Sequence, residues 1–322
     1  YEANLAMNQC DVMLNIGARF DDRVTGRLSD FSPRSTKIHV DIDPSSINKN
    51  VKVDLPIIGD ATMTIERMIK IWKHKGYQKN DPKIKEWWSD IEGWREEKCL
   101  EFKQEGKIIK PQYAIRRLFE KTANKDTFIT TEVGQHQMWA AQYYGFEQPN
   151  RWMTSGGLGT MGYGLPAAMG VQIAHPESLV IDIAGEASIL MNIQELSTMA
   201  QYKMPIKAFI VNNQWMGMVR QWQELNHGSR YSQSYTESLP DFVKLADSFG
   251  GDGMVAETVD ELDGVIDAML NSEKFFLADI RVAKEENCFP MIPSGAAHNE
   301  MILNSGDSGV TPKTTTAGMA LV

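Results

Sequence analysis

Short apolar runs alternate along most of the chain with segments of helical periodicity. Two such runs, 12–16 and 37–42, lie near the N-terminus and are followed by an amphipathic segment at 61–75. From residue 111 the alternation becomes regular and continues to residue 281. Apolar runs of this length between helices predict parallel strands covered on both faces, which is an α/β fold.

The region after residue 111 predicts a doubly wound parallel sheet. The expected helices are 112–121, 137–144, 163–174, 193–201, 216–225, 241–249 and 259–270. The expected strands are 127–131, 152–153, 179–183, 206–211 and 275–281.

Changes in composition divide the chain into four stretches. Residues 1–75 predict part of a Rossmann-like nucleotide-binding fold. Residues 76–110 are charged and rich in tryptophan, with helical spacing from 81 to 104, and predict a helical linker. Residues 111–302 predict a second α/β domain. In 303–322 periodicity is lost among Ser, Gly and Thr, so we expect a disordered tail.

Charge and cysteine content exclude several classes of partner. A net charge of −9 argues against nucleic acid or an anionic membrane surface, and no apolar run reaches the length of a membrane span. Cys10, Cys99 and Cys288 are too few and too scattered for a disulfide framework or a metal cluster. They fit a reducing compartment, and we expect a cytoplasmic protein. An organelle stays open, because the chain does not begin with methionine.

Polar residues follow two successive apolar strands. Gly185-Glu186-Ala187 follows one strand and Asn212-Asn213 ends the next, one βαβ unit later. Ligands of parallel sheets bind at the carboxyl ends of the strands, and carboxylate and amide oxygens suit magnesium when phosphate oxygens complete its shell. These residues predict a metal-diphosphate site. On their own they fit a helix N-terminus and a polar turn equally well.

Glycines cluster just before the helix expected at 163–174. Gly156, Gly157, Gly159, Gly162 and Gly164 precede or begin it. Free amides at a helix N-terminus can bind an anion, and a tight loop is an equally good interpretation.

The spacing of the two polar motifs resembles the thiamine diphosphate motif, Gly-Asp-Gly followed by Asn-Asn. This chain has Gly-Glu-Ala, which places the carboxylate one methylene farther out. Further blocks resemble the acetohydroxyacid synthase (acetolactate synthase) catalytic large subunit. They are Gly17-Ala18-Arg19-Phe20-Asp21-Asp22-Arg23-Val24-Thr25-Gly26, Asp41-Ile42-Asp43-Pro44, Gly134-Gln135-His136-Gln137-Met138-Trp139, Gly156-Gly157-Leu158-Gly159-Thr160-Met161-Gly162, Gly217-Met218-Val219-Arg220-Gln221-Trp222 and Pro290-Met291-Ile292-Pro293-Ser294-Gly295.

The resemblance implies thiamine diphosphate, Mg²⁺ and FAD as cofactors. The metal ligands would be the side chains of Glu186 and Asn213 and the backbone carbonyl of Trp215. Thiamine diphosphate would contact Val133, Gly134, Gln135, His136, Gly159, Met161, Ala187, Ser188, Met216, Gly217 and Met218. FAD would contact Arg19, Val24, Asp41 and Asp60, although Asp21, Asp22 and Arg23 could form only a solvated, ion-paired turn.

The resemblance also assigns roles to single residues. Met161 would brace the bent cofactor beneath its thiazolium ring. For His136 we prefer a hydrogen bond to the diphosphate over a general base. Trp222 would line the substrate channel and favour 2-ketobutyrate over pyruvate as acceptor, by about 1–3 kcal/mol; an ordinary buried aromatic is the alternative. Ser294 would lie near the channel mouth.

The implied reaction is decarboxylation of pyruvate and its ligation to a second 2-ketoacid. The products, 2-acetolactate or 2-aceto-2-hydroxybutyrate, lead to branched-chain amino acids. The resemblance implies a homodimer or tetramer assembled through the thiamine diphosphate site, with a small regulatory subunit. It also implies that the activating glutamate comes from a pyrimidine-binding domain of the other subunit. This sequence contains no such domain, so we expect a C-terminal fragment that is inactive alone.

Two alternatives stay open. Another thiamine diphosphate enzyme, such as a glyoxylate carboligase or a pyruvate oxidase, would share the metal motif. A non-catalytic subunit that binds the cofactor without chemistry would explain Glu186 in place of aspartate.

Overall fold

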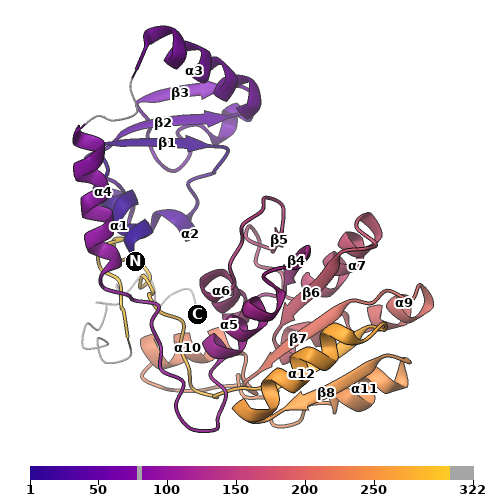
Figure 1. Cartoon of the computed structure of the whole chain (residues 1–322). Coiled ribbons are helices and arrows are strands. Elements are labelled where there is room, and N and C mark those ends of the chain that lie inside the picture. The colour runs from indigo at the N-terminus through magenta and orange to yellow at the C-terminus, as the bar shows by residue number, and fades with distance from the viewer. Residues whose placement is uncertain (78–81, 305–322) are drawn as a thin grey trace. The chain divides into compact units, whose positions relative to one another are not determined.

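A computed structural model describes residues 1–77 and 82–304, which belong to two compact units (Figure 1). Among the described residues, the first unit consists of 1–77, 82–101 and 289–304, and the second unit is Phe102–Cys288. The tail was expected to be disordered, and its residues from 305 on lie outside the described residues. Residues 78–81 of the expected linker also lie outside them.

The first unit contains a three-stranded parallel sheet. Its strands pair in the order β1-β2-β3. The elements are α1 (Glu2–Gln9), β1 (Val12–Ile16), α2 (Asp22–Thr25), β2 (Thr36–Asp41), β3 (Leu55–Ile58), α3 (Ala61–Lys75) and α4 (Pro82–Arg95), with short 3₁₀ turns at Leu28–Asp30 and Pro44–Ser46. The sequence did not predict β3, because its four residues include a proline; an edge strand tolerates that residue.

The segment 289–302 packs within the first unit, whereas the sequence-based boundary placed it in the second domain. The backbone amide of Arg27 donates to the carbonyl of Ala296 (3.0 Å), and the His298 imidazole contacts the carbonyl of Val24 (2.7 Å). These pairings join positions more than 260 residues apart, so no local pattern predicts them.

The second unit is built on a six-stranded, wholly parallel sheet with the order β5-β4-β6-β7-β9-β8. Its strands are β4 (Thr127–Thr131), β5 (Trp152–Met153), β6 (Leu179–Ala184), β7 (Lys207–Asn212), β8 (Asp252–Ala256) and β9 (Phe276–Arg281). Its helices are α5 (Pro111–Thr122), α6 (Gln135–Tyr143), α7 (Gly164–Ala174), α8 (Glu186–Ile189), α9 (Glu195–Gln201), α10 (Gly217–Asn226), α11 (Phe242–Ser248) and α12 (Val259–Asn271), with a 3₁₀ turn at Leu190–Asn192. The predicted α/β fold class is confirmed.

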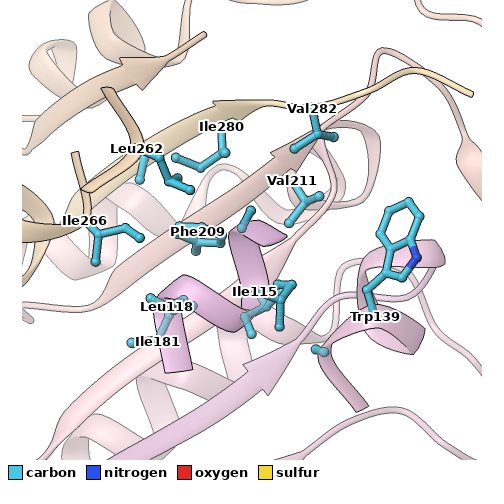
Figure 2. Packing of buried hydrophobic residues seen from close by; sticks show 14 of the residues in the cluster. Ile115, Leu118, Trp139, Ile181, Phe209, Val211, Leu262, Ile266, Ile280 and Val282 are labelled. Carbon is cyan, nitrogen blue, oxygen red and sulfur yellow. The ribbon is translucent and has the colours of Figure 1, made fainter. Parts of the chain in front are cut away.

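Hydrophobic cores cover both faces of this sheet. Side chains of α5 and α12 pack with Phe209 of β7 on one face (Figure 2). Side chains of α7, α9 and α11 form a second cluster with Val180 and Ile210 on the other face. Every residue of β7 is buried, as expected for a central parallel strand. The two polar residues of β7, Lys207 and Asn212, are its first and last residues. Within the described residues, every helix is too short or too polar to cross a membrane.

Replacement of Phe209 by alanine should destabilise the second unit by about 3–5 kcal/mol, because the fully buried ring leaves a cavity. Urea unfolding measures this loss. Ile173→Ala on α7 is the control: Ile173 is 69% exposed, so its truncation should change stability by less than about 0.5 kcal/mol. Equal effects of the two substitutions would contradict this account of the core.

Candidate cofactor and metal site

A cavity lies at the carboxyl ends of β4, β6 and β7, which are neighbours in the sheet. Its lining comes from the segments that follow these strands and from one loop before α7. The lining residues are Val133, Gly134, Gln135, His136, Trp139, Met161, Gly185, Glu186, Ala187, Ser188, Val211, Asn213, Trp215, Met216, Gly217, Met218 and Val219. Of the positions expected to hold the metal and thiamine diphosphate, only Gly159 is missing from the lining of this cavity.

Gly159 lies next to this lining, because a Cβ atom added to it would be 3.9 Å from a methyl carbon of Val133. Its φ angle of +70° favours glycine, as the sharp turn of the loop requires. The structure thus gathers the expected positions at one place. Their roles in binding remain predictions.

Glu186 is the first residue of α8 and is 1% exposed. Its Oε1 atom has no hydrogen-bond partner among the described residues. Burial raises the pKa of this carboxyl to about 8, and the charge of Asp279 adds to the shift, whereas the backbone amides of Asn213 and Trp215 oppose it. An unpaired buried carboxylate oxygen is energetically costly, so a cation at this position would be stabilising.

Asn213 supplies a second oxygen at the same cavity. Its Oδ1 atom accepts a hydrogen bond from the amide of Trp215 (3.0 Å), and an amide oxygen has a second lone pair for a cation. The described residues contain no cluster of three or more His, Cys, Asp or Glu side chains that could hold a metal. One carboxylate with amide and carbonyl oxygens is the donor set of a hard cation such as Mg²⁺, so the residues present fit the implied metal.

His136, near the start of α6, lies beside the segment that carries Glu186. Its ring packs against Gly185, where an added Cβ atom would lie 2.6 Å from Nδ1. The Nε2 atom is 3.5 Å from Oγ of Ser188. Burial lowers the pKa of His136 to about 3. A general base needs a pKa near the working pH, so this low pKa argues against that role. A hydrogen bond from His136 to the diphosphate stays a prediction.

Two buried carboxyl groups that the sequence analysis did not single out lie behind the cavity. Glu132 accepts hydrogen bonds from the amides of Gly162 (2.5 Å) and Leu165 (3.1 Å) and so ties the loop that carries Met161 to β4. Asp182 accepts from Oγ1 of Thr130 (3.1 Å). Burial and the charge of Glu132 raise the pKa of Asp182 well above its ordinary value. An aspartate inside the apolar strand 179–183 was the signal that could have revealed this pair.

The two expected channel residues do not join this cavity lining. Trp222 is half-buried on α10 and does not line the cavity, whereas Met218, one turn earlier, does. Ser294 belongs to the first unit. Their proposed contact with substrate stays a prediction.

The expected FAD positions lie in the first unit, near the carboxyl ends of its strands. Asp41 ends β2, and its Oδ1 atom accepts from the amide of Asp43 (2.8 Å). Asp60 follows β3 and caps α3 through the amide of Met63 (2.9 Å). Dinucleotides bind at this edge of such sheets. These contacts are local, however, and FAD binding stays a prediction.

The remaining FAD candidates follow β1. Arg19 is ion-paired with Asp21 (2.8 Å), and Arg23 is ion-paired with Asp22 (2.6 Å). Asp21 also caps α2 through the amide of Arg23. The segment forms an ion-paired turn. Contact of Arg19 and Val24 with FAD stays a prediction. The carbonyl of Val24 accepts from His298.

Comparison with known proteins agrees with this site. A family model described as the C-terminal TPP binding domain of thiamine pyrophosphate enzymes matches residues 132–280, and a model of their central domain matches residues 1–68. The chain belongs to the thiamine pyrophosphate enzymes, with segments that correspond to these two domains.

Within this family the chain is similar to acetolactate synthase large subunits. It is 45% identical over 304 residues to the large subunit of Haemophilus influenzae, covering 94% of this chain and 53% of that protein. It is 44% identical over 307 residues to the isozyme 3 large subunit of Escherichia coli, with the same coverage. The large subunit of Parasynechococcus marenigrum is 44% identical over 93% of this chain and 48% of its own length. The chain spans about half the length of these curated relatives.

The imidazole of His136 should stay neutral between pH 5 and 8, because desolvation opposes its protonation. Its folded pKa lies below the unfolded value of about 6.5. The folded state therefore binds fewer protons, and stability falls as the pH drops from about 6.5 towards 3, by at most about 1.4 kcal/mol per pH unit. NMR of the ring nitrogens, assigned with His136→Gln, measures the titration. A midpoint near pH 6.5 would contradict the burial argument.

Proposed function

We propose that this chain provides the diphosphate- and metal-binding part of an acetolactate synthase active site. One observation carries the proposal: the buried Glu186 carboxylate has an oxygen without a partner among the described residues, in a cavity that Asn213 and Trp215 also line. The cavity lies in the region matched by the thiamine pyrophosphate-binding family model. The named relatives are acetolactate synthase large subunits.

In this proposal the chain binds and orients the cofactor. Glu186, Asn213 and the Trp215 carbonyl hold Mg²⁺. The N-termini of α6 and α10 lie at the cavity, where free amides and the positive ends of the helix dipoles favour a diphosphate. The loop tied down by Glu132 places Met161 at the cavity wall. Bound thiamine diphosphate supplies the electron sink for decarboxylating a 2-ketoacid.

The similarity to proteins named acetolactate synthase large subunits supports the following proposal for substrates and partners. Pyruvate is the donor, and pyruvate or 2-ketobutyrate is the acceptor, selected beside Trp222 and Ser294. The products are 2-acetolactate or 2-aceto-2-hydroxybutyrate in branched-chain amino acid synthesis. The chain assembles as a dimer or tetramer through the cofactor site, binds a small regulatory subunit, and acts in the cytoplasm. Arg19, Val24, Asp41 and Asp60 contact FAD, which has a structural role.

Two other functions are separable by experiment. A glyoxylate carboligase or pyruvate oxidase would share the metal site, so the products formed from pyruvate and from glyoxylate distinguish them. A non-catalytic, cofactor-binding subunit is motivated by Gly-Glu-Ala in place of Gly-Asp-Gly. For such a subunit, Glu186→Asp should greatly increase the magnesium-dependent affinity for thiamine diphosphate, whereas a functional native site predicts little gain.

Replacement of Glu186 by alanine should weaken magnesium-dependent binding of thiamine diphosphate at least tenfold, because a carboxylate ligand is removed. Isothermal titration of the 322-residue chain with thiamine diphosphate, at several Mg²⁺ concentrations, measures this affinity. Glu177→Ala is the matched control, since Glu177 is exposed and does not line the cavity. Equal binding by all three proteins would overturn the assignment of the metal ligand.

The 322-residue chain alone should bind thiamine diphosphate but form no acetolactate from pyruvate at a steady rate. The reason is that the family's activating glutamate comes from a pyrimidine-binding domain outside the region matched here. A colorimetric acetolactate assay with saturating Mg²⁺, thiamine diphosphate and FAD tests this expectation. Steady product formation would show that the 322 residues contain the whole catalytic apparatus.

A further inference from the structure

A buried row of three side-chain amides leads from Cys288 to the Asn213 metal site. The oxygen of Gln221, on α10, accepts from the backbone amide of Cys288 (2.9 Å), and its nitrogen donates to the carbonyl of the same residue (3.0 Å). A backbone amide only donates and a carbonyl only accepts. The backbone of Cys288 therefore fixes which end of the Gln221 amide is oxygen, a choice that shape alone leaves open.

Gln135, at the start of α6, is the second member of the row. Its nitrogen donates to Oε1 of Gln221 (2.9 Å) and to the carbonyl of Glu286 (3.0 Å). Both N–H groups of Gln135 thus have acceptors inside the protein, and neither is left for a phosphate. The oxygen of Gln135 consequently faces the side chain of Asn213.

Asn213 completes the row. Its nitrogen donates to Oε1 of Gln135 (3.2 Å), and its oxygen accepts from the amide of Trp215. Reversal of this amide would turn N–H groups towards the Trp215 donor and would leave the metal site without an oxygen at this position. Asn213 is thus held in this orientation by Gln135 together with the Trp215 amide, and Gln135 is held by Gln221 together with the Glu286 carbonyl.

We infer that Gln221 and Gln135 are positioning residues that keep the oxygen of Asn213 available for the metal ion. The inference rests on the proposed magnesium-dependent binding of thiamine diphosphate. Gln221, Gln135 and Asn213 are 0%, 2% and 4% exposed, so water cannot take over a lost partner. Each amide is therefore held in one orientation, because the reversed orientation leaves buried donors unpaired.

The same arrangement gives a reason for glycine at position 217. A Cβ atom added there would lie 2.1 Å from Oε1 of Gln135 and 3.0 Å from Nδ2 of Asn213. Any side chain at 217 would displace the amide pair that orients the metal ligand. Glycine is needed here because a side chain would clash, and not because of the backbone conformation, since the φ angle of Gly217 is not positive.

Gln221→Met keeps the length of the side chain and removes both polar ends, so it tests the inference. The Mg²⁺ concentration for half-maximal binding of thiamine diphosphate should rise about 10–100-fold, the range usual for residues that orient a metal ligand. Gln172→Met is the matched control. Gln172 is also a buried glutamine on a helix, donating to the carbonyls of His175, Pro176 and Ser178, and it does not line the cavity. It should lose comparable stability in urea with less than a twofold change in Mg²⁺ requirement.

A double-mutant cycle separates positioning from general destabilisation. In an Asn213→Ala background, Gln221→Met should not raise the Mg²⁺ requirement further, because the amide that it orients is gone. An additive effect there, or equal effects of Gln221→Met and Gln172→Met, would overturn the inference. Failure of the unsubstituted chain to bind thiamine diphosphate with Mg²⁺ would instead reject the proposed function.

If Gln221→Met does not unfold cooperatively, Gln221→Glu provides a second test of the positioning role. Glutamate keeps an acceptor for the Cys288 amide and for Gln135, and loses the donor to the Cys288 carbonyl. Its Mg²⁺ requirement should stay within about threefold of the native value. A rise of tenfold or more would overturn the inference.

Discussion

The buried carboxyl group of Glu186 is the feature on which the proposed cofactor site depends. Ligands of a parallel sheet bind at the carboxyl ends of its strands, and β6 ends just before Glu186. Burial there raises the pKa of the carboxyl and leaves one oxygen unpaired among the described residues. A cation at this position would remove the penalty, and this is the physical basis of the proposed metal site.

The groups around Glu186 are held by other buried polar side chains. Glu132 ties the loop of Met161 to the end of β4, and the amide row from Gln221 orients Asn213. The donors and acceptors in both arrangements are buried. Only one arrangement of the side chains satisfies all of these hydrogen bonds. The positions of these groups are therefore set by the protein itself, which lowers the entropy that binding must overcome.

Local patterns predicted most of the second unit, because strands buried on both faces are continuous apolar runs. They missed β8, whose Asp252-Gly253 start resembles a turn, and β3, which contains a proline. Both lie at sheet edges, where strands need little apolar character. The expected helix 81–104 ends at Arg95, and the place of 289–302 in the first unit depends on contacts distant in sequence. Periodicity carries no information on such contacts.

Local pattern by itself determined the α/β class of fold and the polar residues Glu186 and Asn213 after two successive strands, because the ends of parallel strands meet at one edge of a sheet. The remaining cavity positions came from the family resemblance. Only the tertiary structure decided the protonation, the hydrogen-bond partners and the side-chain orientation of the residues in and around the cavity. It buried His136 and so kept it neutral, paired Glu132 with the loop before α7, and fixed the amide of Asn213 through Gln135. These properties depend on desolvation and on partners distant in the chain, which no short motif specifies.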